Sequence, residues 1–151
     1  MKTRIAINGF GRIGRRVLRA ALSNPNVEIV AVNDLTAPEV MAHLFKHDSV
    51  HGAVKEDVRL DGSTLRIGKH TVHLSAEKDP NALPWKKHEI DIAMECTGIF
   101  TDKAKAAMHI NAGAKRVIIS APSKDADITI CMGINDHLYD PARHRLLTAA
   151  S

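Results

Sequence analysis

The sequence lacks any apolar run of the length that a membrane span requires. A spanning helix needs roughly 18 consecutive apolar residues, and no stretch of these 151 residues approaches that length. The first ten residues, MKTRIAINGF, lead directly into strand-like sequence without the apolar region of a signal peptide. These two absences argue against a membrane or exported protein, and we expect a cytoplasmic location with no membrane partner.

Cysteine is scarce, with Cys96 and Cys131 as its two occurrences. Each stands in an apolar, strand-like run, which is typical of a buried free thiol and not of a disulfide. We therefore expect both thiols to be buried, to react slowly with alkylating agents and to belong to a reducing compartment.

Repeats, low-complexity tracts and a linker that would divide the chain are absent as well. Hydrophobic residues make up 44% of the sequence and charged residues 25%, which is ordinary for a globular protein. A chain of this length buries about 68–70% of the surface that its unfolded form exposes. We expect residues 1–151 to form one domain with its own core.

The net charge of +4 and the pI near 9.2 raise the question of a nucleic-acid partner. The basic residues cluster at one place, where four arginines recur at helical spacing: Arg12, Arg15, Arg16 and Arg19. The opposite side of that segment is apolar, so an amphipathic helix with a solvated polar face accounts for the pattern. A nucleic-acid surface, a subunit contact and an anion site are the less favoured alternatives.

What the sequence does contain is an alternation of strand-like and helix-like segments. Residues 3–8 predict a strand, residues 12–23 a helix that ends before Asn24-Pro25-Asn26, and residues 28–34 a second strand. This second strand is apolar almost to its end, as in strands buried on both faces of a parallel sheet. The three segments together predict a βαβ unit.

The next segment carries signals for a short helix and a hairpin. Thr36 and Glu39, with Pro38 between them, have the spacing of a capping box, which predicts a helix that continues through about Lys46. Two strand candidates, TLRIG and TVHLSA, then meet at Gly68-Lys69-His70. This arrangement predicts an antiparallel hairpin inserted in the domain.

The parallel pattern resumes after the hairpin. Strands are predicted at residues 90–96, 116–121, 127–135 and 145–150, and a helix at residues 102–111. The alternation predicts the α/β class, with a doubly wound, mostly parallel sheet that carries an inserted antiparallel hairpin. Ligands bind such sheets at the carboxyl ends of the strands.

One motif lies at the first of these strand ends. Gly9-Phe10-Gly11-Arg12-Ile13-Gly14 follows a predicted strand and opens a predicted helix, and Asp34 stands twenty residues past Gly14. This is the context of the G-x-G-x-x-G loop of Rossmann-type folds, in which the glycines permit a tight turn, approach of a diphosphate and packing of the helix. The N–H groups of Arg12 and Ile13 would bind the diphosphate, and Asp34 the adenosine ribose.

Two other patterns are weaker. His43, His47 and His51 have helical spacing, but the helix signal ends before His51 and no Cys or Glu completes a zinc site, so we expect no metal. Ser120 and Ser123 lack the G-x-S-x-G elbow of a serine hydrolase.

Several stretches, in chain order, resemble the N-terminal half of the phosphorylating glyceraldehyde-3-phosphate dehydrogenase family. They are INGFGRIGRRVLRA, VAVNDL, KHDSVHG, ECTGIFTD, NAGAKRVIISAPSKDAD and MGIND, and the similarity extends over residues 3–151 without a large gap. The resemblance implies NAD as cofactor. It also implies glyceraldehyde 3-phosphate and phosphate as substrates and a homotetramer for the complete glycolytic enzyme.

The resemblance also assigns roles to single residues. Lys78 corresponds to a basic residue near the adenine, Ser120 to a hydroxyl beside the nicotinamide ribose, and three further residues to the wall at a strand end. In full, the cofactor-binding residues implied are Asn8, Gly9, Phe10, Gly11, Arg12, Ile13, Gly14, Asn33, Asp34, Lys78, Thr97, Gly98, Phe100 and Ser120.

In that family the last strand runs into Ser-Cys-Thr-Thr-Asn, whose Cys attacks the aldehyde before hydride passes to NAD and phosphate releases the acyl group. Ser151 corresponds to the substrate-binding residue just before that Cys, so the resemblance places the catalytic domain and its His base outside residues 1–151. We expect this chain to bind NAD, to be inactive alone and to expose apolar surface that promotes self-association.

Two alternatives stay open at this point. Erythrose-4-phosphate dehydrogenase shares most of the motifs, although Asn33-Asp34-Leu35 and Ser120-Ala121-Pro122-Ser123 are more similar to the glyceraldehyde-3-phosphate enzyme. A protein of another class, a stand-alone NAD-binding regulatory module, is the second alternative.

Overall fold

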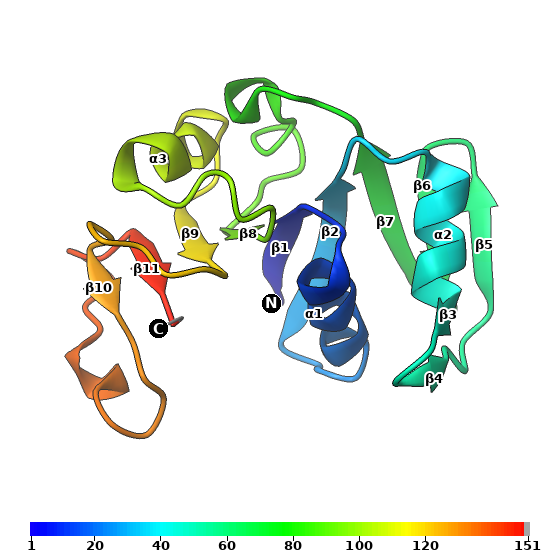
Figure 1. The fold of residues 1–151 in the computed structure, drawn as a ribbon, viewed down its shortest axis with the longest axis horizontal. Coiled ribbons are helices and arrows are strands. Elements are labelled where there is room, and N and C mark those ends of the chain that lie inside the picture. Colours follow the sequence, from blue (N-terminus) through cyan, green and yellow to red (C-terminus); the bar gives the residue numbers. More distant parts are fainter. Residues whose placement is uncertain (150–151) are drawn as a thin grey trace.

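The computed structural model describes residues 1–149, and within them most strands belong to one sheet. Its parallel strands are β1 (Thr3–Asn8), β2 (Val27–Asn33), β7 (His70–Ser75), β8 (Ile92–Glu95), β9 (Arg116–Ile119), β10 (Ile128–Thr129) and β11 (Leu146–Thr148). The antiparallel strands β5 (Val58–Asp61) and β6 (Thr64–Ile67) extend one edge. In the described residues the order is β10, β11, β9, β8, β1, β2, β7, β6, β5 (Figure 1).

Strand β1 lies inside the sheet, with a parallel neighbour on each side. The register places Asn8, its last residue, opposite Asn33 at the end of β2 and opposite Glu95 at the end of β8. Three polar side chains therefore meet where three apolar strands end, which is the edge at which the sequence predicts a ligand.

The predicted hairpin is confirmed, and a further strand extends it. Strands β6 and β7 are antiparallel, and β7 pairs in parallel with β2. The sequence analysis did not predict β5, which pairs with β6 across the two-residue loop Gly62-Ser63. Gly62 has a φ of 59°, which glycine adopts without strain. A Gly-Ser loop between two short strands is a recognised hairpin signal that could have revealed β5.

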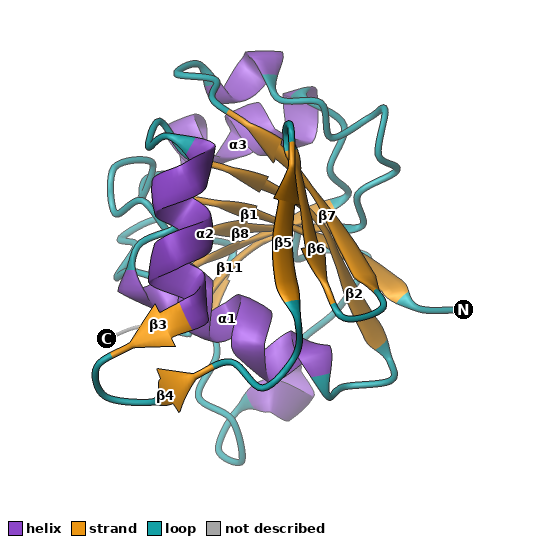
Figure 2. Ribbon diagram, turned by 90° about the vertical axis from the view of Figure 1, so that its right-hand side faces the viewer, coloured by secondary structure: helices purple, strands orange, loops and turns teal. Residues whose placement is uncertain are grey.

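Two helices cover one face of the sheet (Figures 1 and 2). They are α1 (Arg12–Leu22) and α2 (Pro38–Lys46), which agree closely with the predicted helices. Leu18 of α1 and Phe45 of α2 are fully buried and pack with Ile7 of β1 in the main apolar core. After α2, the strands β3 (His47–Asp48) and β4 (Gly52–Ala53) form a small separate ribbon.

The opposite face is covered by α3 (Lys103–Asn111) and by the chain segment around Trp85. That segment begins with the 3-10 turn η1 (Pro80–Ala82). Helix α3 begins as predicted, because the N-cap side chain of Asp102 accepts a hydrogen bond from the Lys105 backbone N–H at 2.9 Å. Among the described residues, no helix is long and apolar enough to cross a membrane.

The predicted capping box before α2 is wrong. Ala37 occupies the N-cap position and provides no side-chain cap, and α2 begins at Pro38. The backbone N–H of Thr36 instead donates to Asp34 Oδ1 at 2.9 Å. The Asp34 carboxylate thus organises this connection and moves the start of the helix two residues beyond Thr36.

The strand predicted at residues 127–135 is also mostly wrong, because β10 ends at Thr129. The Asn135 side chain accepts from the Cys131 backbone N–H at 2.6 Å and donates to the Thr129 carbonyl at 3.1 Å. These bonds close a turn that carries the chain away from the sheet, and the turn η2 (Asp136–Leu138) follows. Cys131 is therefore exposed, contrary to the expectation that both thiols are buried.

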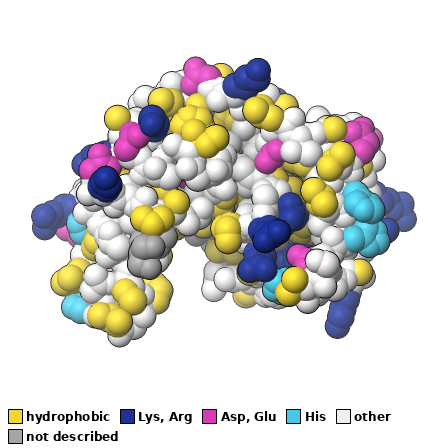
Figure 3. Space-filling view, in the orientation of Figure 1, with side chains coloured by type: hydrophobic (Ala, Val, Ile, Leu, Met, Phe, Trp, Pro, Cys, Tyr) yellow, Lys and Arg dark blue, Asp and Glu magenta, His cyan; other side chains and the backbone are white. Residues whose placement is uncertain are grey.

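One half of the sheet is open on the α1 side, next to this turn. A hollow of about 360 Å³ there has mainly apolar walls, formed by Ile92, Arg116, Ile118, Ile130, Met132, Asp136, Tyr139 and Leu147. Figure 3 shows hydrophobic side chains gathered on the lobe that the connection between β10 and β11 forms. Met132 and Ile134 are 76% and 72% exposed. This surface has no covering layer among residues 1–149.

Candidate functional site

A second hollow, of about 380 Å³, opens at the carboxyl ends of β1, β2 and β8 and beside the loop that follows β7. Its lining residues are Asn8, Gly9, Gly11, Asn33, Asp34, Leu35, Glu77, Lys78, Cys96, Thr97, Ile99 and Phe100. Eight of the residues named from the sequence are among them. The structure therefore brings residues from four separate chain segments together at the predicted edge of the sheet.

The three glycines of the loop serve three different needs of this geometry. A Cβ on Gly14 would stand 2.1 Å from the carbonyl oxygen of Gly9, so only glycine lets α1 pack this closely against the loop. Gly9 has a φ of 94°, and a Cβ there would stand 2.8 Å from the backbone N of Thr97. Nothing lies within 4 Å of a Cβ built on Gly11, whose backbone borders the hollow.

The start of α1 offers hydrogen-bond donors beside this open backbone. Gly11 is the N-cap residue of the helix and has no side chain to cap it. The N–H groups in the first turn of a helix point along its axis and carry a partial positive charge, which suits an anion such as a diphosphate.

Asp34 is held in place by two backbone donors. Its Oδ2 accepts from the N–H of Phe10 at 2.6 Å, and its Oδ1 accepts from the N–H of Thr36 at 2.9 Å. Burial raises the pKa of this carboxyl, but the hydrogen bonds from Phe10 and Thr36 outweigh it and hold the pKa below its usual range. The carboxylate is ionised at neutral pH, and a carboxylate has about four acceptor positions, so it can still accept from a hydroxyl group in the hollow.

The rest of the wall is partly apolar. Leu35 and Ile99 line the hollow although they are 61% and 65% exposed, which leaves apolar surface available to a flat ring. Thr97 Oγ1 accepts from the Ile99 N–H at 3.1 Å and fixes the turn after β8. Lys78 supplies a cation at the rim, next to Glu77.

Six of the residues named from the sequence do not line the hollow. One is Gly14, whose role is in packing, and the other five are Phe10, Arg12, Ile13, Gly98 and Ser120. The Phe10 ring is buried and stacks on Phe45 with 6.0 Å between ring centroids, so its backbone alone reaches Asp34. Ile13 is 48% exposed, and Arg12 lines a separate basic hollow. Gly98 is exposed beside the turn.

The fifth residue, Ser120, lies next to Cys96, with which it forms a hydrogen bond, and its backbone N–H donates to the Glu95 carbonyl at 2.9 Å. Ser151 lies outside the described residues.

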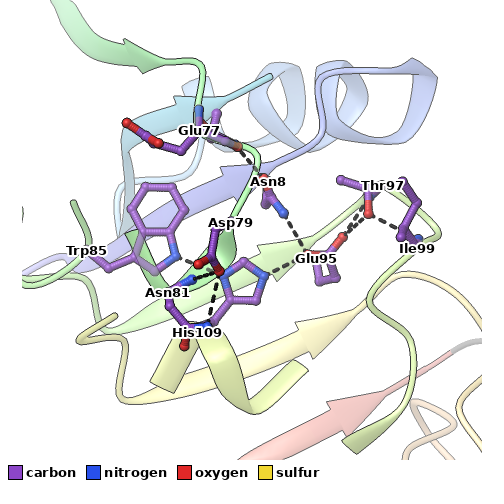
Figure 4. A network of polar contacts seen from close by, with 10 residues as sticks. Asn8, Glu77, Asp79, Asn81, Trp85, Glu95, Thr97, Ile99 and His109 are labelled. Carbon is purple, nitrogen blue, oxygen red and sulfur yellow. Dashed lines mark hydrogen bonds and ion pairs between the residues drawn. The ribbon is translucent and has the colours of Figure 1, made fainter. Parts of the chain in front are cut away.

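A buried polar network beneath the hollow was missed by the sequence analysis (Figure 4). Its centre is Glu95, which is 1% exposed and accepts from Asn8 Nδ2 at 2.8 Å. The other Glu95 contacts come from Thr97, two residues later in the chain, and from His109 of α3, which lies 2.6 Å away. A carboxylate at the end of an apolar strand, Glu95 in the run IDIAMEC, was the available signal.

The Cys96 thiol in the wall of the hollow is not activated for nucleophilic attack. Burial raises the pKa of the Cys96 thiol to about 11, against the smaller opposite effect of the Ser120 hydrogen bond. The described residues also contain no cluster of His, Cys, Asp and Glu that could hold a metal ion. The arrangement can thus bind a ligand with an anionic group, hydroxyl groups and a flat ring.

A protein-family model and several known proteins are similar to the chain. The family model described as glyceraldehyde 3-phosphate dehydrogenase, NAD binding domain, matches residues 3–103. Glyceraldehyde-3-phosphate dehydrogenases from Priestia megaterium and Geobacillus stearothermophilus are 55% and 51% identical to it, and glyceraldehyde-3-phosphate dehydrogenase 1 from Bacillus subtilis is 53% identical.

Each of these three similarities covers 100% of this chain and 45% of the relative. The chain therefore spans just under half the length of these relatives. Because the family model matches about two thirds of the chain, and because the loop, the carboxylate and the hollow have the required arrangement, the chain belongs to the family of NAD-binding domains of glyceraldehyde 3-phosphate dehydrogenases.

Proposed function

We propose that the hollow at the ends of β1, β2 and β8 binds NAD and that residues 1–151 are the cofactor-binding domain of a phosphorylating glyceraldehyde-3-phosphate dehydrogenase. The observation that carries the proposal is the distance of 2.6 Å between Asp34 Oδ2 and the Phe10 N–H. In this contact the Asp34 carboxylate, which we propose binds the ribose, lies directly against the glycine loop, and this supports the binding of a single dinucleotide to both groups.

Each part of the cofactor has a partner in this arrangement. The Gly11 backbone and the first N–H groups of α1 would hold the diphosphate, and Asp34 would accept a hydrogen bond from the adenosine ribose. The apolar side chains at the rim and Lys78 would hold the adenine. Thr97 and Ser120 would border the nicotinamide, and NAD would supply a hydride acceptor when bound.

The whole reaction needs groups that this chain does not provide in its described part. Its two thiols are unsuited to attack an aldehyde, because the pKa of Cys96 is raised to about 11 and Cys131 lies away from the hollow. We place the nucleophile, its base and the sites for glyceraldehyde 3-phosphate and phosphate in the remaining part of the relatives' length. Ser151 would contact the substrate, and the complete enzyme would be a cytoplasmic homotetramer.

The test is a calorimetric titration with NAD and with its 2′-phosphorylated analogue. The ionised carboxylate of Asp34 has no hydrogen to donate to the 2′-phosphate of the analogue and repels it. Two unit charges about 4 Å apart interact by up to about 4 kcal/mol at an effective dielectric constant near 20. We expect NAD to bind at least about tenfold more tightly. The variant Asp34→Asn should reduce that ratio, and a ratio of one in the unmodified chain would refute the Asp34 assignment.

The same preparation, freed of host dehydrogenase, is then assayed for NADH formation from glyceraldehyde 3-phosphate and phosphate. We expect binding without turnover. Turnover that scales with this chain would show that the nucleophile lies within it, and the division into a cofactor domain and a separate catalytic domain would have to be abandoned.

A further inference from the structure

In the buried network beneath the hollow, the direction of hydrogen-bond donation is fixed along each branch. An indole N–H can only donate, and Trp85 Nε1 donates to His109 Nδ1 at 2.9 Å. The His109 ring is therefore the tautomer that carries its proton on Nε2, and this N–H donates to Glu95 Oε2 at 2.6 Å. Figure 4 shows Trp85, His109 and Glu95 in a row on one side of the network.

The second branch begins at a backbone donor that also cannot be reversed. The N–H of Glu77 donates to Asn33 Oδ1 at 2.8 Å, and the amide of Asn33 is thereby oriented so that its Nδ2 donates to Asn8 Oδ1 at 2.8 Å. The amide of Asn8 is oriented in turn, and its Nδ2 donates to Glu95 Oε2 at 2.8 Å. Both branches end at the same carboxylate.

The other oxygen of Glu95 is also surrounded by donors. Its Oε1 accepts from the backbone N–H of Thr97 at 2.9 Å and from the Thr97 hydroxyl at 2.5 Å. Burial raises the pKa of Glu95, and the hydrogen bonds from His109, Thr97 and Asn8 outweigh it and hold the pKa below its usual range. A group that accepts at both oxygens and donates at neither is an ionised carboxylate.

Four residues of this network are also walls of the hollow. Asn8, Asn33, Glu77 and Thr97 all line it, whereas Glu95, His109 and Trp85 do not. Asn8, Asn33 and Glu95 are at most 3% exposed, so water does not substitute for a lost partner without rearrangement of the site.

We infer that Glu95 is a positioning residue for the cofactor: its carboxylate holds the wall residues Asn8 and Thr97 directly, and Asn33 through Asn8, before NAD enters, without touching NAD itself. The inference rests on the proposed function, because NAD is the ligand whose binding it concerns. Pre-orientation of this kind strengthens binding by removing the cost of ordering side chains when the ligand arrives.

The critical variant is Glu95→Gln, which keeps the shape and replaces one acceptor with a donor. If its amide N–H₂ group takes the Oε2 position, it meets the donors of His109 and Asn8, which cannot reverse unless Trp85 or Glu77 loses its partner. If it takes the Oε1 position, it meets the backbone N–H of Thr97, which cannot reverse at all. We expect the NAD dissociation constant to rise by about tenfold, as for the loss of one ordinary hydrogen bond.

The matched control is Trp85→Phe, which removes the donor at the far end of one branch and leaves the Glu95 carboxylate with its other partners. We expect it to lower the melting temperature and to leave the NAD dissociation constant within about twofold of the parent value. Equal losses of affinity in the two variants would mean that the network acts through stability alone, and would overturn the inference. Normal affinity in a folded Glu95→Gln variant would overturn it as well.

A measurement on the unmodified chain covers the case in which Glu95→Gln does not fold. NMR of the side-chain amides should show Asn8 and Asn33 with single, slowly exchanging signals before NAD is added. Averaged, rapidly exchanging signals would show that the wall is not fixed in advance. If the parent chain itself fails to bind NAD, the proposed function fails, and this result is distinct from either outcome of the variants.

Discussion

The two thiols lie in opposite environments. Cys96 is partly buried at the end of β8, where burial raises its pKa to about 11. Cys131 is exposed in the turn after β10. Because the thiolate is the form that reacts, we expect an alkylating agent near neutral pH to label Cys131 quickly and Cys96 slowly. Mass spectrometry of peptides from a time course would measure both rates in the folded protein.

The variant Cys131→Ser provides the control for this experiment. It should retain one slowly reacting thiol that becomes accessible in denaturant. Fast labelling of Cys96 in this variant would contradict the environment that the structure gives it. NAD should slow the reaction of Cys96 further, because this residue lines the cofactor hollow.

At the residue scale, local sequence revealed those parts of the site that local chain geometry determines. The glycine loop and Asp34 belong to one βαβ unit, so their meeting follows from the fold of that unit. Glu95 and Asn8 are 87 positions apart, and Trp85 and His109 are 24 apart. Their contacts depend on how β8 and α3 pack, which no local pattern encodes. The exposure of Cys131 was missed for a different reason: the turn depends on a local hydrogen bond to the side chain of Asn135, four residues later, which the apolar run did not reveal.

At the element scale, two glycines in the connection between β1 and α1 should affect different properties, one the stability of the fold and the other the affinity for NAD. A Cβ on Gly14 would lie 2.1 Å from the Gly9 oxygen, so Gly14→Ala must push α1 away from the sheet. We expect it to lower the free energy of unfolding by roughly 1–3 kcal/mol or more. Urea unfolding followed by circular dichroism would measure the loss.

The matched substitution is Gly11→Ala, three residues earlier. Its Cβ meets nothing within 4 Å in the protein, so we expect a change in stability of about 0.5 kcal/mol, from the weaker N-cap. The methyl group would stand beside the hollow, where the diphosphate approaches the backbone, and NAD affinity should fall. A normal NAD affinity for Gly11→Ala would contradict the position proposed for the diphosphate.

The same scale shows why some elements were predictable and others were not. Helix α1 carries a strong apolar periodicity, β2 an almost continuous apolar run, and α3 an end signal at Gly113, and the structure confirms these elements and β1. Helix α2 starts later than its capping signal because Asp34 competes for the Thr36 N–H. Strand β10 is an edge strand paired on one side with β11. An apolar run alone did not reveal that its pairing stops at Thr129.

At the scale of the whole molecule, the uncovered face over β8, β9 and β11 should make this chain self-associate. Its hollow of about 360 Å³ is bordered by Met132, and Leu138 nearby in the chain is 57% exposed. Exposed apolar patches of this kind promote association. Sedimentation velocity should show a mean mass that rises with concentration. Met132→Lys should reduce the rise.

Val50→Lys is the control for that experiment. Val50 is 77% exposed and lies next to the basic hollow, away from the uncovered face. Its replacement should leave association unchanged. An unmodified chain that stays monomeric at all concentrations would contradict the prediction.

The central place of β1 also has a consequence for the order in which the protein folds. Strand β1 meets β2 through residues 24 positions apart, but it meets β8 through residues 87 apart. Closing the longer loop costs about 1 kcal/mol more in chain entropy. We therefore expect the βαβ unit and the hairpins to form early and β8 to join late, so the cofactor hollow comes into existence only with the last parallel pairing of the sheet core.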